Sequence, residues 1–357
     1  MPGSTKARGS EMAEPHTTVQ EAMLAQDWPV VRRVAQDWAA ACEREQRRDP
    51  RPYFALNVAH LMLGEFTEAF RTHERALVEA ADIETVRGWV DALLAAHQDS
   101  PVAHTVAGLF LAQSAQSEQS AERYKEAIRL NPTWAHPHYF LAQIHERAGR
   151  AELAIKEYRE AVKLDPSFAP ARINLGVLYQ HQGRLEMAIP QYREVIRSNP
   201  TDAIAYANLA SALAEQGKTE PAIAAYQEAL RLNPDDAEVH FALASLYETK
   251  NRLDLAMKEY QEALRANPNF AAAETAVGWI HLKHNRPLEA MNAFSRAVKL
   301  DAEDARAYLG IGDIYHRRGK PHLANENYAL ALKYEKDPEK KTQIINDLFR
   351  QGSTWDL

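Results

Sequence analysis

Apolar and small side chains recur along much of this chain at a fixed interval of 34 residues. The units begin at residues 101, 135, 169, 203, 237, 271 and 305, and the apolar positions of each unit predict two amphipathic helices. Helix A is expected at about positions 2–14 of each unit and helix B at about positions 18–30. Position 32, where proline ends helix B, is occupied by Pro132, Pro166, Pro200, Pro234 and Pro268.

Three other positions of the unit carry a fixed residue class. Position 8 is Gly or Ala in all seven units, position 20 is Ala in six of them, and position 24 is always Tyr or Phe. Small residues let helices A and B approach closely, and the aromatic side chain is expected to fill the space between helix B and the next helix A. Because one helical hairpin cannot bury its own apolar face, the units are expected to stack on their neighbours.

This pattern resembles the tetratricopeptide repeat. Segments 173–200 and 207–234 are similar to members of that family, and the resemblance extends over about residues 101–338. It implies an all-α fold, a right-handed α-solenoid of helix-turn-helix repeats. In this family helix A lines a concave face through positions 2, 5, 6, 9, 12 and 13.

The two ends of the chain depart from the repeat. Residues 84–100 predict a single helix, which is half a unit and should make the array locally irregular. The predicted organisation is a disordered tail at 1–17, irregular repeat-like helices at 18–100 with a clearer repeat at 50–83, seven repeats at 101–336, a capping helix at 337–352 and a tail at 353–357.

Composition narrows the class of protein. The chain has 42 basic and 49 acidic side chains, a formal charge of −7, which argues against a general binder of nucleic acid or anionic membranes. Lone Cys42 excludes an internal disulfide and fits a reducing compartment. Without a long apolar run or a secretory signal, the sequence predicts a cytoplasmic protein with no membrane insertion.

The sequence contains no motif of a catalytic, phosphate-binding or zinc site, so no enzyme activity and no cofactor are expected. Among the 14 histidines, His281 and His284 have a spacing that one metal ion could use. His281 falls at position 11, which points into the packing, and we expect no metal site there.

The predicted functional surface is the concave face. Its helix A positions hold a mixture of aromatic, aliphatic and amide side chains that suits a peptide ligand. The candidate residues are Tyr139, Gln143, Ile173, Asn174, Val177, Asn208, Ser211, Phe241, Trp279 and Leu309.

Asn174 and Asn208 both stand at position 6 of adjacent repeats. Side-chain amides offer a donor and an acceptor, so they can hold an extended backbone whatever its sequence. This resembles the asparagine ladder of the O-linked N-acetylglucosamine transferase repeats, although the transferase catalytic domain is absent. The alternative is that both side chains only solvate the surface of helix A.

The sequence therefore favours a non-enzymatic adaptor or scaffold that binds a peptide or a partner protein in the concave groove. Two alternatives stay open. The chain could form a self-associating structural scaffold, that is a homo-oligomer, or serve as the non-catalytic targeting subunit of a separately encoded enzyme.

Overall fold

The structure is a computed structural model that describes residues 15–63, 65, 68, 72 and 83–350. All regular structure in these ranges is helical, and the chain divides into two compact units, Met1–Leu178 and Tyr179–Leu357. The helices that begin in the first unit are α1 (Pro15–Leu24), α2 (Trp28–Arg44), α3 (Arg51–Leu63), α5 (Ile83–Ala96), α6 (Pro101–Gln113), α7 (Ser117–Leu130), α8 (Ala135–Arg147), α9 (Ala151–Leu164) and α10 (Ala169–His181).

The second unit starts within α10 and continues the alternation of helices. Its elements are α11 (Leu185–Ser198), α12 (Ala203–Glu215), α13 (Thr219–Leu232), α14 (Ala237–Thr249), α15 (Leu253–Ala266), α16 (Ala271–Lys283), α17 (Pro287–Leu300), α18 (Ala305–Arg317), α19 (Pro321–Tyr334) and α20 (Pro338–Arg350). The even-numbered helices from α6 to α18 are the A helices and the odd-numbered ones from α7 to α19 are the B helices, each within about one residue of its predicted start. The predicted all-α repeat fold is confirmed.

The turn between helices A and B requires a left-handed residue at position 15. Four of these residues are glycines, such as Gly149 at φ +69° and Gly217 at φ +77°. Ala115, Asn251 and Asn285 hold the same position with φ near +57°. Asparagine tolerates this region better than alanine, so the turn of the first repeat carries the largest backbone penalty, about 1–2 kcal/mol.

The aromatic side chain at position 24 packs directly on the small residue at position 8. Tyr124, Tyr158, Tyr192 and Tyr328 are all at most 1% exposed. A Cβ placed on Gly108 would lie 2.5 Å from the Tyr124 ring. Helices A and B therefore meet at a distance that larger side chains at position 8 would prevent.

In the third, fifth and seventh repeats, the side chain at position 4 forms a hydrogen bond to the repeat before it. Arg172 Nε donates to the Pro166 carbonyl at 2.8 Å, and the Tyr308 hydroxyl donates to the Ala302 carbonyl at 3.3 Å. In both cases the acceptor is the backbone of position 32 of the preceding repeat. Because that carbonyl lies beyond the end of helix B, it has no partner within the helix, and the position-4 donor supplies one.

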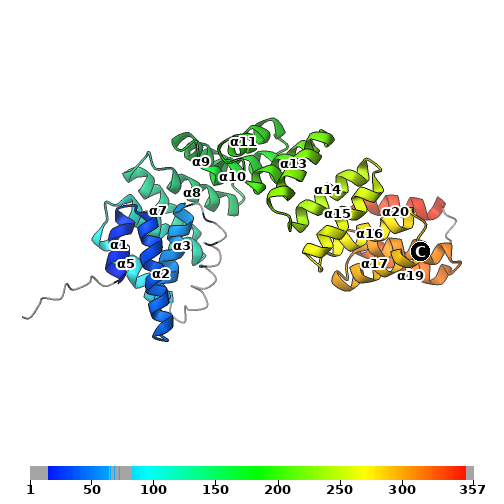
Figure 1. Cartoon of the computed structure of the whole chain (residues 1–357), viewed down its shortest axis with the longest axis horizontal. Helices are drawn as coiled ribbons and strands as arrows, with labels where there is room; N and C mark the ends of the chain where they lie inside the picture. The colour runs from blue at the N-terminus through cyan, green and yellow to red at the C-terminus, as the bar shows by residue number, and fades with distance from the viewer. Residues whose placement is uncertain (1–14, 64, 66–67, 69–71, 73–82, 351–357) are drawn as a thin grey trace, which may run out of the picture. The chain divides into compact units, whose positions relative to one another are not determined.

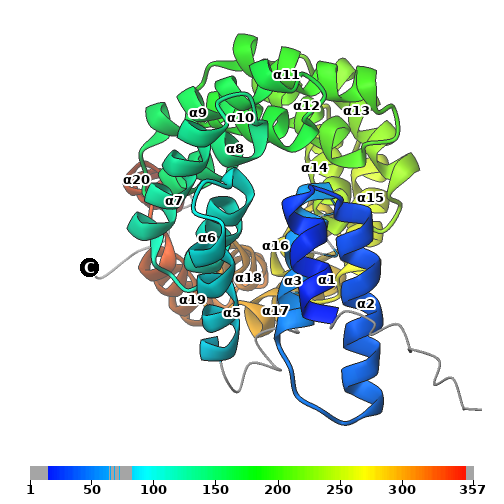
Figure 2. The ribbon, with the colours of Figure 1, turned by 90° about the vertical axis from the view of Figure 1, so that its left-hand side faces the viewer.

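The N-terminal helices pack on the first repeats instead of extending the regular array. Figures 1 and 2 show α1, α2 and α3 lying together; α1 contacts α6, and α3 contacts α5. The Phe54 and Phe110 rings are 5.9 Å apart, and Gln113 Nε2 donates to Asn57 Oδ1 at 2.6 Å. Helix α1 begins at Pro15, inside the segment predicted as a tail, and α5 forms the extra single helix. Most of the second half of the predicted repeat 50–83 lies outside the described residues.

Helix α20 follows the last repeat. Asp337 accepts the Glu339 backbone N–H at 2.9 Å, so it begins the helix as a side-chain cap. Ile344 packs against the cluster of Ala324 and Tyr328. This apolar contact is the one expected of a terminal helix that closes a repeat array.

Candidate peptide-binding surface

The candidate surface, called here the A-helix face, consists of the side chains at positions 2, 5, 6, 9, 12 and 13 of the A helices. Each compact unit has its own part of it. In the first unit the candidates lie on α8 (Tyr139 and Gln143) and α10 (Ile173, Asn174 and Val177). In the second unit they lie on α12 (Asn208 and Ser211), α14 (Phe241), α16 (Trp279) and α18 (Leu309).

Tyr139 belongs to the core and not to the surface expected from the sequence. It is 2% exposed, and its ring lies 5.0 Å from that of Phe168 and 5.8 Å from that of Tyr158. Burial of this large ring among other aromatic side chains explains the difference. Its hydroxyl accepts a hydrogen bond from Nε2 of half-buried Gln143 at 3.0 Å. Tyr139 therefore helps to hold the Gln143 side chain but is not itself exposed on the A-helix face.

Asn174 is half-buried and its amide is partly engaged within the protein. Its Nδ2 donates to the Tyr158 hydroxyl at 3.0 Å, and that hydroxyl donates to Glu146 Oε2 at 2.7 Å. Burial, together with the Glu146 carboxylate, raises the pKa of Tyr158, so the hydroxyl keeps its proton. The Oδ1 of Asn174 and the second hydrogen of its Nδ2 are left for a ligand. Ile173 and Val177, both half-buried, flank it on α10.

The A-helix face is closed at the first repeat. Thr105 and Leu109 occupy positions 5 and 9, yet they are 0% and 5% exposed. Both lie on α6, which α1 contacts and which α3 meets through Phe54 and Asn57. In the first unit the accessible part of the face is therefore confined to α8 and α10.

In the second unit, Ser211 and Asn208 differ in their hydrogen bonding. Ser211 Oγ accepts from Gln180 Nε2 at 2.9 Å, which links α12 to the end of α10. Asn208 is half-buried and makes no side-chain hydrogen bond to the described residues. Of the two position-6 amides, Asn208 is the one with all its donor and acceptor positions available.

Phe241 and Trp279 present partly exposed rings. Phe241 packs 5.3 Å from Tyr260 and 4.9 Å from Phe270, and Trp279 packs edge-on to Phe294 at 5.5 Å. The indole N–H of Trp279 is buried and has no acceptor among the described residues. The partly exposed ring of Trp279 therefore carries an unmet donor, a group that usually has a hydrogen-bond partner.

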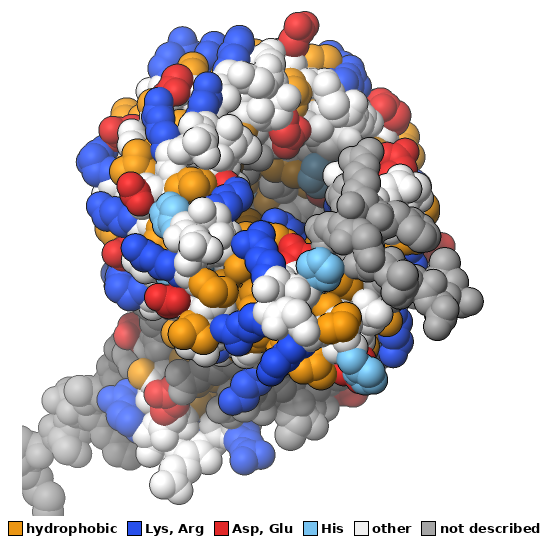
Figure 3. Space-filling view, turned by 90° about the vertical axis from the view of Figure 1, so that its right-hand side faces the viewer, with side chains coloured by type: hydrophobic (Ala, Val, Ile, Leu, Met, Phe, Trp, Pro, Cys, Tyr) orange, Lys and Arg blue, Asp and Glu red, His pale blue; other side chains and the backbone are white. Residues whose placement is uncertain are grey.

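Charged and apolar side chains complete this part of the face. Lys283 Nζ donates to Glu248 Oε1 at 2.7 Å and so joins α16 to α14. Leu309 is half-buried on α18 and packs on the cluster of Tyr328. In the view of Figure 3, basic, acidic and apolar side chains are interspersed.

The sequence analysis missed the partners of the position-24 hydroxyls. The hydroxyl of Tyr328 donates to Asp313 Oδ1 at 2.9 Å and that of Tyr260 donates to Glu248 Oε2 at 3.1 Å. Burial raises the pKa of Tyr260 to about 12. The available signal was an acidic or amide residue at position 9 or 12 of helix A, which serves as acceptor for a tyrosine that is otherwise buried.

Within the described ranges, no three His, Cys, Asp or Glu side chains are placed to hold a metal ion. His281 Nδ1 is buried without a hydrogen bond, and burial lowers the pKa of this ring. None of the helices described here combines the length and the apolar character needed to cross a bilayer.

The family model of the tetratricopeptide repeat matches residues 105–169, 141–203, 173–234, 207–269 and 276–339. These segments cover more than half of the chain, and the chain belongs to the tetratricopeptide repeat family. Repeats of this family generally serve as scaffolds for protein–protein interaction. No curated protein is similar enough in sequence to count as a match.

Solved structures agree with this fold. A tetratricopeptide repeat protein from Parabacteroides merdae is 15% identical, with a TM-score of 0.55, over 70% of this chain and 98% of its own. PilF of Pseudomonas aeruginosa is 21% identical, with a TM-score of 0.52, over 58% and 94%. The Cut9–Hcn1 hetero-tetramer of APC/C contains a chain that is 17% identical, with a TM-score of 0.52, over 74% and 51%. At these identities the likeness shows the fold alone.

Proposed function

We propose that this protein is a non-enzymatic adaptor that binds an extended peptide of a partner protein on the A-helix face of the second unit. The observation that carries the proposal is the pair of unmet polar groups on that face. Asn208 has a free amide, and Trp279 has an indole N–H without an acceptor. An extended backbone offers carbonyls and N–H groups to such side chains.

The neighbouring side chains supply the apolar part of the contact. Phe241 lies on α14, between the helices that carry Asn208 and Trp279, and is only partly buried. Aromatic side chains of this kind dominate the energy of most protein interfaces. Leu309 on α18 would extend the contact by one repeat.

Binding can be tested with a displayed library of random 12-residue peptides. Peptides selected by the protein are synthesised, and their Kd is measured by calorimetry. The double variant Asn208→Ala/Trp279→Phe removes the two unmet groups and keeps an aromatic ring in place. Each lost hydrogen bond contributes about 0.5–1.5 kcal/mol, so the Kd should rise about ten-fold or more.

The matched control is Leu255→Ala/Leu288→Ala, which changes exposed side chains on the B helices α15 and α17. This control should bind the selected peptides with unchanged Kd. The proposal fails if no peptide is selected, or if both double variants bind alike. Light scattering of the same samples separates peptide capture from self-association, because a self-associating scaffold shows a mass that grows with concentration.

A further inference from the structure

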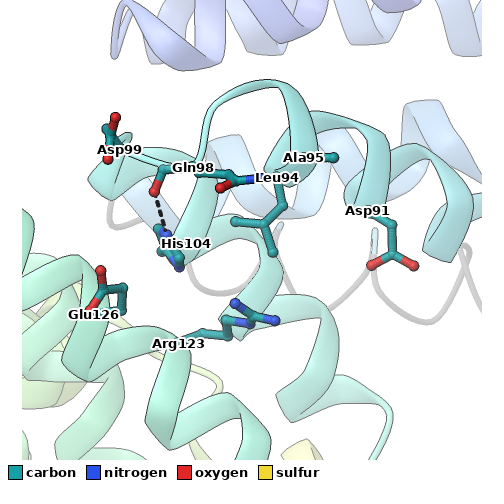
Figure 4. Close-up of a pocket in the computed structure, with 8 residues that line it drawn as sticks. All are labelled: Asp91, Leu94, Ala95, Gln98, Asp99, His104, Arg123 and Glu126. Atoms are coloured by element: carbon teal, nitrogen blue, oxygen red, sulfur yellow. Dashed lines mark hydrogen bonds between the residues drawn. The ribbon is translucent and has the colours of Figure 1, made fainter.

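A pocket of about 550 Å³ opens between α5, α6 and α7, and none of its lining residues is a candidate of the A-helix face (Figure 4). It lies wholly within the first unit and is formed where the extra helix α5 precedes the first repeat. Its lining consists of Asp91, Leu94, Ala95, Gln98, Asp99, His104, Arg123 and Glu126.

His104 stands at position 4 of its repeat, and the same position is occupied by His240 four repeats later. His104 Nε2 bonds to the Gln98 carbonyl at 2.8 Å, and His240 Nε2 bonds to the Pro234 carbonyl at 3.0 Å. Each carbonyl belongs to the residue six places earlier. The two rings are therefore held in the same way by the backbone in front of them.

The repeats differ in the hydrogen-bond partner of the other ring nitrogen, Nδ1. His240 Nδ1 bonds to Glu259 Oε2 at 2.7 Å, and His138 Nδ1 of the second repeat bonds to Glu157 Oε2 at 2.7 Å. Both glutamates occupy position 23. Position 23 of the first repeat is Arg123, and His104 Nδ1 is buried with no hydrogen-bond partner.

His104 itself is 6% exposed, so this unmet nitrogen belongs to a side chain that is more than nine-tenths buried. A buried polar atom without a partner costs about 1–3 kcal/mol. In the second and fifth repeats the carboxylate of position 23 removes that cost. In the first repeat no carboxylate stands at position 23 to bond to Nδ1. The pocket lies next to this nitrogen instead.

The charged side chains that line the pocket determine which kind of ligand can bind there. Arg123 forms no ion pair with any described residue, and neither does Asp91 or Asp99. Glu126 is already paired with Arg129 at 2.6 Å. The pocket thus combines one unpaired guanidinium with two unpaired carboxylates, an arrangement that suits a molecule with both charges and disfavours a polyanion.

We propose that this pocket binds a zwitterionic ligand whose carboxylate replaces the missing glutamate of position 23. The carboxylate accepts a hydrogen bond from His104 Nδ1 and pairs with Arg123; because Nε2 already donates to the Gln98 carbonyl, the ligand binds the form of the ring that carries a proton on both nitrogens. The cationic end of the ligand lies towards Asp91, on the opposite side of the pocket from Asp99 (Figure 4). Since Arg123 stands where Glu157 and Glu259 stand, its side chain turns aside as the ligand enters and then meets the carboxylate. This site is independent of the peptide surface proposed above.

The probe is 6-aminohexanoate, which carries a carboxylate and an ammonium on a flexible chain. It is titrated into the full-length protein labelled with ¹⁵N-histidine, and the His104 ring resonances are followed by NMR. Saturable shifts of those resonances are expected. Acetate and hexylamine, each with one of the two charges, should bind at least ten-fold more weakly. A second arm uses the N-acetylated dipeptide Gly-Lys with a free C-terminus, whose binding would identify a peptide end as the source of the carboxylate.

The decisive variant is Arg123→Glu, which gives the first repeat the partner already present in the second and fifth. It should occupy His104 Nδ1 internally and abolish the shifts caused by 6-aminohexanoate. Lys125→Glu is the matched control, because it makes the same charge change at an exposed site on α7 and should retain binding. If Arg123→Glu fails to fold, Arg123→Gln replaces it as the test of the Arg123 contact. Shifts that persist in either Arg123 variant, or no saturable shift in the unmodified protein, would overturn the proposal.

Discussion

The Arg296 guanidinium holds the buried Glu274 carboxylate by two parallel hydrogen bonds, Nε to Oε1 at 2.6 Å and Nη2 to Oε2 at 2.7 Å. Glu274 stands at position 4 of its repeat, where other repeats have histidine, and its cation comes from position 26 of helix B. Position 4 therefore carries His, Arg or Glu in the first, second, third, fifth and sixth repeats. The hydrogen bonds to Glu274 raise the pKa of Arg296, so the guanidinium stays charged.

Removing this cation should destabilise the protein. Arg296→Met leaves the Glu274 carboxylate buried without its partner, and the free energy of unfolding should fall by about 1–3 kcal/mol. Urea denaturation followed by circular dichroism measures the change. Arg231→Met breaks an exposed pair with Glu228 and is the control, with an expected loss below about 1 kcal/mol. Equal losses in the two variants would contradict the special role of the Glu274 pair.

Adding one methyl group should have opposite effects at two glycines. In Gly278→Ala the new Cβ would lie 2.5 Å from the Phe294 ring, so the buried ring must move and the protein should lose about 1–3 kcal/mol of stability. At Gly88 of α5 nothing lies within 4 Å, and alanine there should stabilise the helix by up to about 1 kcal/mol. Thermal unfolding of both variants checks the prediction, which a destabilised Gly88→Ala or a neutral Gly278→Ala would refute.

Acid should weaken the first unit through His136. Burial lowers the pKa of this ring, against a smaller opposing effect of the Asp165 carboxylate. The stabilising contribution of the neutral ring is present above the unfolded-state pKa of about 6.5 and is lost as the pH falls through the lower folded-state pKa. Urea midpoints at pH 7.5 and 5.5 should differ less in His136→Phe than in the unmodified protein. His322→Gln, at an exposed site, should leave the difference unchanged.

The buried position of Tyr139 leads to a prediction about stability and not about binding. Tyr139→Ala should cost about 3–5 kcal/mol, because it removes the ring that fills the space beside Phe168 and Tyr158. Gln143→Ala, one helical turn away at the surface, should cost less than about 1 kcal/mol. Should Tyr139→Ala prove as stable as Gln143→Ala, the ring does not belong to the core.

The 34-residue period predicted the helix pairs well because each A–B contact depends on local spacing. Small residues at position 8 and rings at position 24 meet within one hairpin, as Gly108 and Tyr124 do. Whether the side chain at position 5 is buried was harder to predict. Tyr139 and Phe241 both pack on an aromatic residue of position 34, yet Tyr139 is fully buried and Phe241 is not.

The N-terminal packing could not be read from the period. The contact of Phe54 with Phe110 joins residues on either side of the extra helix α5, where the 34-residue spacing is interrupted. A period predicts only contacts between neighbouring units. For the same reason the unmet Nδ1 of His104 becomes visible only when the repeats are compared atom by atom.

Each position-4 donor comes later in the chain than its acceptor, so the two parts of the contact are synthesised in a fixed order. Arg172 donates to the carbonyl of Pro166, and Tyr308 donates to that of Ala302, so each of these two junctions is completed by the helix that comes after it. On a ribosome, the end of one helix B therefore waits for the following helix A to leave the exit tunnel. A nascent chain halted between repeats would leave its newest junction open to water, and folding would advance one repeat behind translation.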